Sequence, residues 1–90
     1  MNKQVHVIFR GRVQGVGFRF FVHDHARRLG LSGWVRNLAN GGVEAVATGE
    51  HECLQQFLVL CKNGPPAAVV QDVNVEWQET SEGLANFTIR

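Results

Sequence analysis

One short segment constrains the fold of this chain more than any other. Three glycines, at positions 11, 15 and 17, lie between two different hydrophobic periodicities. Apolar residues alternate along residues 5–13, as in a strand with one buried face, whereas residues 18–29 follow helical spacing. The chain must therefore turn sharply from a strand into a helix, through backbone conformations that glycine adopts with the least strain.

This turn predicts a binding site for an anion of phosphate size. Successive N–H groups in a tight glycine turn can point at one position, beside a helix N-terminus that carries partial positive charge. Arg19 falls in the first helical turn, where its guanidinium can reach the same position. Neither a Walker loop nor a dinucleotide fingerprint is present, because no Gly-Lys-Ser/Thr follows and Phe20 replaces the third small residue. Taken alone, the glycines are equally compatible with a purely structural turn.

The remaining periodicities predict a ferredoxin-like α+β fold. We expect helices near residues 19–29 and 51–62, and strands near residues 5–13, 33–38, 43–48, 69–77 and 85–89. Asn40-Gly41 predicts a two-residue type I′ hairpin, which needs positive φ at both positions. The order β-α-β-β-α-β matches the split β-α-β plan, with two helices on one face of a mainly antiparallel sheet. A short fifth strand follows a polar turn near residues 79–83, and its pairing partner cannot be derived from the sequence.

Composition narrows the class of protein. A length of 90 residues with 44% hydrophobic content suits a single domain over residues 1–90. The formal net charge of +1 argues against a nucleic-acid partner, and no apolar run approaches the ~20 residues of a membrane span. Because no secretory signal follows Met1, we expect a cytoplasmic protein. Cys53 and Cys61 would lie ~12 Å apart on one helix, too far for a disulfide, so we expect reduced thiols.

The expected topology brings a second polar group to the glycine turn. A crossover helix makes the first and second strands parallel, so both end at the same edge of the sheet. The third strand lies between them, which separates their axes by ~10 Å. Asn37, near the end of the second strand, can therefore reach a ligand held by the glycine turn and Arg19. The neighbouring Arg36 is expected to face solvent.

Two long motifs give the chain a family resemblance. Residues 11–19, GRVQGVGFR, resemble the first signature of the acylphosphatases, and residues 33–49, GWVRNLANGGVEAVATG, resemble their second. The element order also fits along essentially the whole chain. Phe9 and Asn40 stand where the family more often has a branched aliphatic residue and an aspartate, and neither position belongs to the motif arginine or asparagine.

The resemblance implies an enzyme that hydrolyses acyl phosphates to a carboxylate and inorganic phosphate. The reaction would use a positioned water and no metal, cofactor or covalent intermediate. Catalysis is assigned to Arg19 and Asn37. Phosphate binding is assigned to the backbone of Gln14, Gly15, Val16, Gly17, Phe18 and Arg19. The implied partners are a small-molecule acyl phosphate and inorganic phosphate as product inhibitor, with neither nucleic acid nor membrane. We expect a monomer and, since no further domain follows Arg90, a free-standing enzyme.

The same scaffold is also compatible with other functions. A non-catalytic anion- or protein-binding module is the main alternative, because fold does not determine function. RNA binding is disfavoured because the strands lack the aromatic pattern of RNA-binding sheets, and a copper chaperone would need a Cys-x-x-Cys motif. The Gln14 side chain is expected to stabilise the turn. His23 and His25 diverge on their helix, so neither is expected to act as base or metal ligand.

Overall fold

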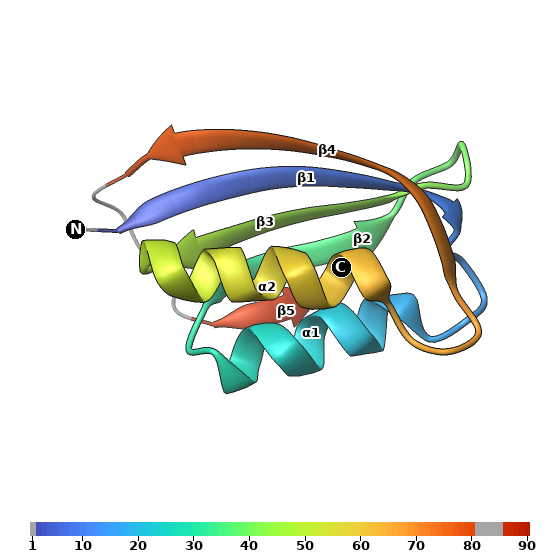
Figure 1. The fold of residues 1–90 in the computed structure, drawn as a ribbon, viewed down its shortest axis with the longest axis horizontal. Coiled ribbons are helices and arrows are strands. Elements are labelled where there is room, and N and C mark those ends of the chain that lie inside the picture. The colour runs from blue at the N-terminus through green and yellow to red at the C-terminus, as the bar shows by residue number, and fades with distance from the viewer. Residues whose placement is uncertain (1, 81–85) are drawn as a thin grey trace.

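A sheet covered on one face by two helices makes up the computed structural model, which describes residues 2–80 and 86–90 (Figure 1). The strands are β1 (Lys3–Arg12), β2 (Ser32–Asn37), β3 (Val43–Gly49), β4 (Val69–Glu79) and β5 (Phe87–Ile89). The helices are α1 (Phe18–Arg28) and α2 (His51–Asn63). The predicted elements are thus confirmed, and their described ends agree with the predicted ones to within two residues. Ala85, expected in the last strand, and most of the predicted polar turn lie outside the described residues.

The order of strands across the sheet is β4-β1-β3-β2-β5. Since β3 pairs antiparallel with both β1 and β2, these two strands run parallel and end at the same edge. This confirms the split β-α-β arrangement that the sequence predicts. The partner of the last strand is now defined, because β5 pairs in parallel with β2, with Phe87 opposite Gly33.

Alternation along β1 decides which face of the sheet is buried. Val5, Val7 and Phe9 are fully buried beneath the helices, whereas His6 and Ile8 lie half-buried on the open face. The helices complete the core with Phe18, Val22 and Ala26 from α1 and Leu54, Phe57 and Cys61 from α2. The rings of Phe9 and Phe18 meet edge to face, with centroids 4.9 Å apart. This contact packs the start of α1 onto the end of β1.

The connection between β2 and β3 is not the two-residue type I′ turn expected at Asn40-Gly41, so that prediction is wrong. Its loop has three residues, 39–41: the Leu38 amide donates to the Gly42 carbonyl at 2.8 Å, and the Gly41 amide donates to the Leu38 carbonyl at 3.2 Å. Gly41 has a positive φ of 94°, but Asn40 does not. The Asn40 side chain instead accepts a hydrogen bond from the Gly42 amide at 3.0 Å, which stabilises a turn closed by a left-handed glycine.

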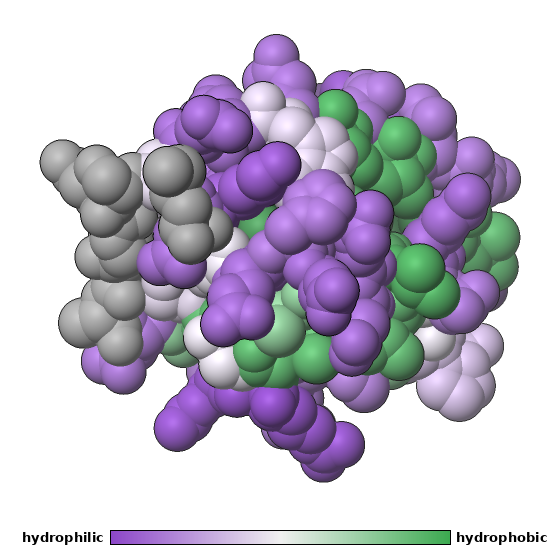
Figure 2. Space-filling view, turned by 60° about the vertical axis from the view of Figure 1, so that its left-hand side comes forward, coloured by the Kyte–Doolittle hydropathy of each residue, from purple (hydrophilic) through white to green (hydrophobic). Residues whose placement is uncertain are grey.

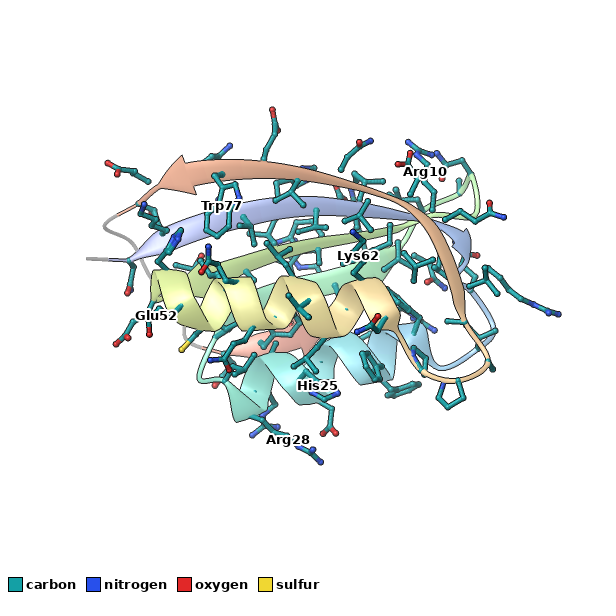
Figure 3. All side chains as sticks on the ribbon, in the orientation of Figure 1. Arg10, His25, Arg28, Glu52, Lys62 and Trp77 are labelled. Atoms are coloured by element: carbon teal, nitrogen blue, oxygen red, sulfur yellow. The ribbon has the colours of Figure 1, made fainter. Side chains whose placement is uncertain are left out.

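The two tryptophans pack on opposite faces of the sheet. Trp77 of β4 lies opposite Val5 on the helix side, with its ring 5.0 Å from that of His51, and is 42% exposed (Figure 3). Trp34 of β2 lies on the open face, where the guanidinium groups of Arg36 and Arg90 stand 5.4 and 4.6 Å from its ring. Trp77 thus packs beside α2, whereas Trp34 packs beneath two arginine side chains.

Candidate active site

The glycine-rich segment forms the loop between β1 and α1, at the edge where β1 and β2 both end (Figure 1). Gly15 and Gly17 adopt left-handed backbone, with φ of 74° and 77°. A Cβ atom on either glycine would meet nothing within 4 Å. Glycine is therefore required here for its backbone conformation and not for lack of space.

The start of α1 presents unused backbone donors. Gly17 is the N-cap residue and provides no side-chain cap, and the first helical hydrogen bond runs from the Phe21 amide to the Gly17 carbonyl at 3.0 Å. The amides of residues 15–20 donate to no acceptor within residues 2–80 and 86–90. Such a helix N-terminus attracts an anion through its free N–H groups and its partial positive charge.

Arg19 adds a full positive charge to this helix end. Its side chain is half-buried in the first turn of α1, directly after the fully buried Phe18. The guanidinium forms no ion pair with any carboxylate in the described part of the chain. Its donors therefore remain available for an anion, in the two-pronged geometry that suits phosphate oxygens.

Asn37 reaches the same side of the sheet from β2. It is the last residue of that strand and lies directly opposite Val43, which is fully buried beneath the helices. Because directly opposed residues share a face, the Asn37 side chain points to the helix side, where the loop after β1 also lies. It is exposed to solvent. The sequence-predicted placement of Asn37 and the glycine loop at one edge of the sheet agrees with this geometry.

The Gln14 side chain joins the two loops at this edge. Its Nε2 donates to the carbonyl of Leu38 at 2.7 Å and to the carbonyl of Gly42 at 2.9 Å. The sequence predicts that Gln14 stabilises the glycine turn, whereas these hydrogen bonds run from it to the β2–β3 connection. Their acceptors are main-chain carbonyls of the β2–β3 connection, and no sequence signal identifies such acceptors.

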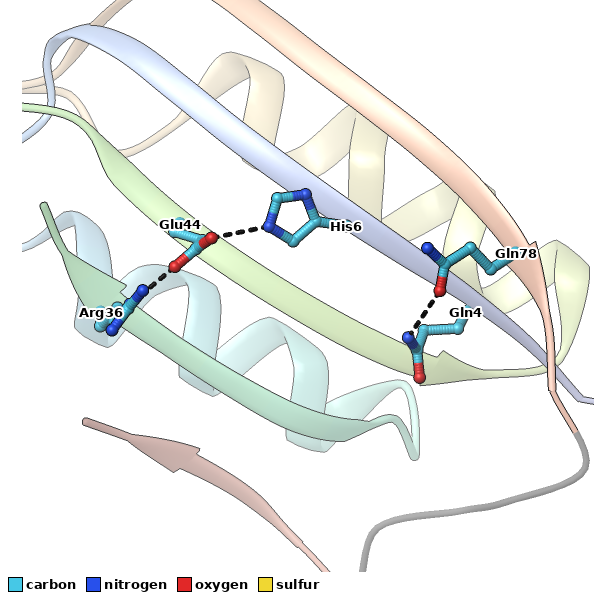
Figure 4. Close-up of polar contacts among 5 residues, drawn as sticks. All are labelled: Gln4, His6, Arg36, Glu44 and Gln78. Atoms are coloured by element: carbon cyan, nitrogen blue, oxygen red, sulfur yellow. Dashed lines mark hydrogen bonds and ion pairs between the residues drawn. The ribbon is translucent and has the colours of Figure 1, made fainter.

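A separate polar network occupies the open face of the sheet (Figure 4). Glu44 accepts a hydrogen bond of 2.7 Å from His6 and one of 2.6 Å from Arg36. The hydrogen bond from His6, together with the bond and charge of Arg36, lowers the pKa of Glu44 despite the opposing effect of burial. Arg36 is thus exposed, as expected, but paired. Because this face is opposite to the helices, the network lies outside the candidate site.

The two histidines of α1 pack against aromatic rings. The rings of His23 and His25 stand 6.1 Å from Phe87 and 4.4 Å from Phe21, respectively. Both cysteines are free, as expected, and burial raises the pKa of Cys61. Among residues 2–80 and 86–90, no three His, Cys, Asp or Glu side chains gather where one metal ion could bind. Neither helix in this part of the chain is long and apolar enough to span a membrane.

A groove between α2 and β4 is one of the hollows elsewhere on the described surface. It is lined mostly by apolar side chains, namely Leu58, Val59, Val70, Val73 and Val75, with Lys62 and Asp72 among the polar ones. Apolar patches also stand out among polar side chains in Figure 2. No residue of the β1–α1 loop or of the β2–β3 connection lines this groove. Its apolar walls do not suit a phosphoryl group, so the loop remains the better candidate.

Several known proteins resemble this chain in sequence and in structure. The acylphosphatase family model matches residues 5–89. A protein of Trichormus variabilis named acylphosphatase is 54% identical over 87 residues, covering 97% of this chain and 85% of its own length. The crystal structure of acylphosphatase from Bacillus subtilis matches with a TM-score of 0.95 and 43% identity, covering 98% of both chains. The structure of T. kodakarensis HypF matches with a TM-score of 0.84 and 32% identity, covering 98% of this chain and 12% of HypF.

Proposed function

This chain belongs to the acylphosphatase family and hydrolyses acyl phosphates, and from that premise we propose that its β1–α1 loop binds the phosphoryl group while Arg19 and Asn37 catalyse the reaction. One observation carries the proposal. A helix end with free amides and an unpaired arginine lies at the same sheet edge as an exposed asparagine. Amides and arginine suit an anion, and the asparagine suits the water that attacks it.

The chemistry of the substrate explains why so few residues are needed. An acyl phosphate is a mixed anhydride of a carboxylic acid and phosphoric acid. Water adds to phosphorus, the bond from phosphorus to the acyl oxygen breaks, and the carboxylate leaves with the electron pair. Since a carboxylate is a stable leaving group, the enzyme has to anchor the phosphoryl group, stabilise its charge and place the water.

The backbone from Gln14 to Arg19 and the Arg19 side chain divide the first two tasks. The free amides of the loop surround the phosphoryl oxygens and hold the group against the start of α1. The guanidinium grips two oxygens side by side and stabilises the charge that develops as the bond breaks. The loop amides take their positions from the folded backbone, so they need little reorganisation during the reaction.

Asn37 performs the third task. Its carboxamide has both a donor and an acceptor, so it can hold a water molecule opposite the leaving carboxylate. The amide does not need to act as a base, because the leaving group is good. Acetyl phosphate, carbamoyl phosphate, other small acyl phosphates and aspartyl phosphates on proteins all present this same reacting group.

The Arg19→Gln variant tests the charge-stabilising role. We expect a folded protein whose hydrolysis of benzoyl phosphate, measured with a chelator present, falls by at least ~10²–10³. Arg27→Gln is the matched control, since Arg27 is exposed at the opposite end of the same helix. Near-normal turnover of Arg19→Gln would remove this arginine from the mechanism.

The Asn37→Ala variant tests the division of roles. It should lower mainly kcat, while inorganic phosphate still inhibits, because the amides and Arg19 remain intact. Asn74→Ala is the control, since Asn74 is an exposed asparagine of β4. Loss of phosphate inhibition with an unchanged kcat would place Asn37 in phosphate binding instead.

Three further properties belong to the same proposal. Inorganic phosphate acts as a product inhibitor, because the loop binds the same tetrahedral anion before and after hydrolysis. The enzyme acts as a monomer, since Arg19, Asn37 and the loop all come from one chain. It works in the cytoplasm, where a protein with two free thiols keeps them reduced.

A further inference from the structure

Gln14 is the side chain that connects the two halves of the candidate site. Within the described residues, its two hydrogen bonds are the side-chain hydrogen bonds that link the β1–α1 loop to the β2–β3 connection. The acceptors are the carbonyls of Leu38 and Gly42, the two residues that flank the three-residue turn. These two residues are also joined directly, because the Leu38 amide donates to the Gly42 carbonyl. Both N–H bonds of one carboxamide therefore span the base of the turn.

We propose that Gln14 is a positioning residue for hydrolysis, which holds Asn37 at a fixed place relative to the phosphoryl-binding loop. The inference rests on the proposed function. Gln14 directly precedes Gly15, at the start of the loop, and Leu38 directly follows Asn37. Each end of the clamp is thus one peptide bond away from a group that acts on the substrate.

The surroundings explain why such a clamp is needed. Asn37 is exposed at the end of its strand, and the turn after it closes with the left-handed Gly41. On the other side, Gly15 and Gly17 carry no side chain, and a Cβ atom on either would meet nothing within 4 Å. A misplacement of ~1 Å between a reacting group and its partner can lower a rate by ~10²-fold. The half-buried carboxamide ties the start of the β1–α1 loop to both ends of the β2–β3 turn.

The clamp can be removed without leaving buried groups unpaired. The Leu38 carbonyl also accepts from the Gly41 amide, and the Gly42 carbonyl also accepts from the Leu38 amide. Each acceptor therefore keeps one hydrogen bond when the Gln14 donor is lost. A variant that lacks this donor is expected to fold, which makes its effect on catalysis measurable.

The Gln14→Met variant tests the proposal. We expect kcat for benzoyl phosphate to fall by ~10–100-fold, as for a misplaced reacting group, while the inhibition constant of inorganic phosphate changes less than ~3-fold. Gln14→Asn keeps the carboxamide but shortens the side chain by one methylene, so it should also lower kcat. Gln4→Met is the matched control, because the Gln4 carboxamide bonds to Gln78 and Thr48 on the open face. Urea unfolding of each variant checks that the fold is retained.

A double-mutant cycle shows whether Gln14 acts through Asn37. If it does, adding Gln14→Met to Asn37→Ala lowers kcat no further, because the group being positioned is already gone. Two independent, multiplying losses would overturn the inference, as would an unchanged kcat in Gln14→Met or a phosphate inhibition that weakens in parallel with kcat. If Asn37→Ala itself left kcat unchanged, the proposed function of Asn37 would fail, and this inference would fall with it.

Discussion

Replacement of Gly33 by alanine should break the pairing that delivers Asn37 to the site. Gly33 is buried in β2 with a φ of 143°, a conformation that L side chains rarely adopt. A Cβ atom there would overlap the carbonyl oxygen of Val46 and lie 2.8 Å from its carbonyl carbon. Carbon and oxygen atoms of neighbouring strands ordinarily stay ~3.3 Å or more apart. The obstacle is backbone, so it cannot rotate away as a flexible side chain would.

The loss of stability depends on how much of the pairing between β2 and β3 is disrupted. To admit the methyl group, β2 has to move away from β3, and several hydrogen bonds worth ~1 kcal/mol each are weakened together. Strain at this φ, outside the left-handed helical region, adds ~1–3 kcal/mol. We expect a loss of at least ~4 kcal/mol of unfolding free energy, out of roughly 5–13 kcal/mol for a domain of this length.

Urea unfolding followed by tryptophan fluorescence measures this loss, because Trp34 is the next residue of β2. Gly30→Ala is the matched control: its φ is 71°, and a Cβ there meets nothing within 4 Å, so only the strain of ~1–2 kcal/mol applies. Any soluble Gly33→Ala protein should also hydrolyse benzoyl phosphate poorly. A Gly33→Ala protein as stable as Gly30→Ala would refute the reasoning, since it would mean that the two strands accommodate the methyl group.

Three further predictions concern the open face, the thiols and the start of α1. The pKa of Glu44 is lowered in the folded state, so its stabilising effect is present above the ordinary value of 4.5 and disappears as pH falls through the lower folded value. The difference in melting temperature between wild type and Glu44→Gln should therefore shrink in acid. A difference that stays the same from pH 7 to pH 3 would contradict this. A thiol reagent should modify Cys53 in the native protein and Cys61 only after denaturation, because burial raises the pKa of the Cys61 thiol. If both thiols of the native protein reacted, the core around Cys61 would have to open. Phe18→Ala should cost ~3–5 kcal/mol in urea unfolding, and a loss below ~1 kcal/mol would mean that its contact with Phe9 contributes little.

Most of the architecture could be predicted from sequence because it depends on neighbours along the chain. The alternation of Val5, Val7 and Phe9 and the helical spacing after Phe18 identify each element and its buried face. One crossover helix then makes β1 and β2 parallel, which is enough to bring Asn37 to the same edge as the glycine loop. The motifs that indicate the family lie on these same local elements.

Tertiary structure decided the features that depend on distant main-chain groups. The three-residue β2–β3 turn is the exception, because its hydrogen bond from the Gly42 amide to the Asn40 side chain joins residues only two apart. The pairing of β5 with β2, and the hydrogen bonds from Gln14 to carbonyls 24 and 28 residues away, have no counterpart in the sequence pattern. Every residue carries the same carbonyl, so no side-chain pattern can mark which one becomes an acceptor. Only the packing of the strands brings a particular carbonyl within reach of a particular donor.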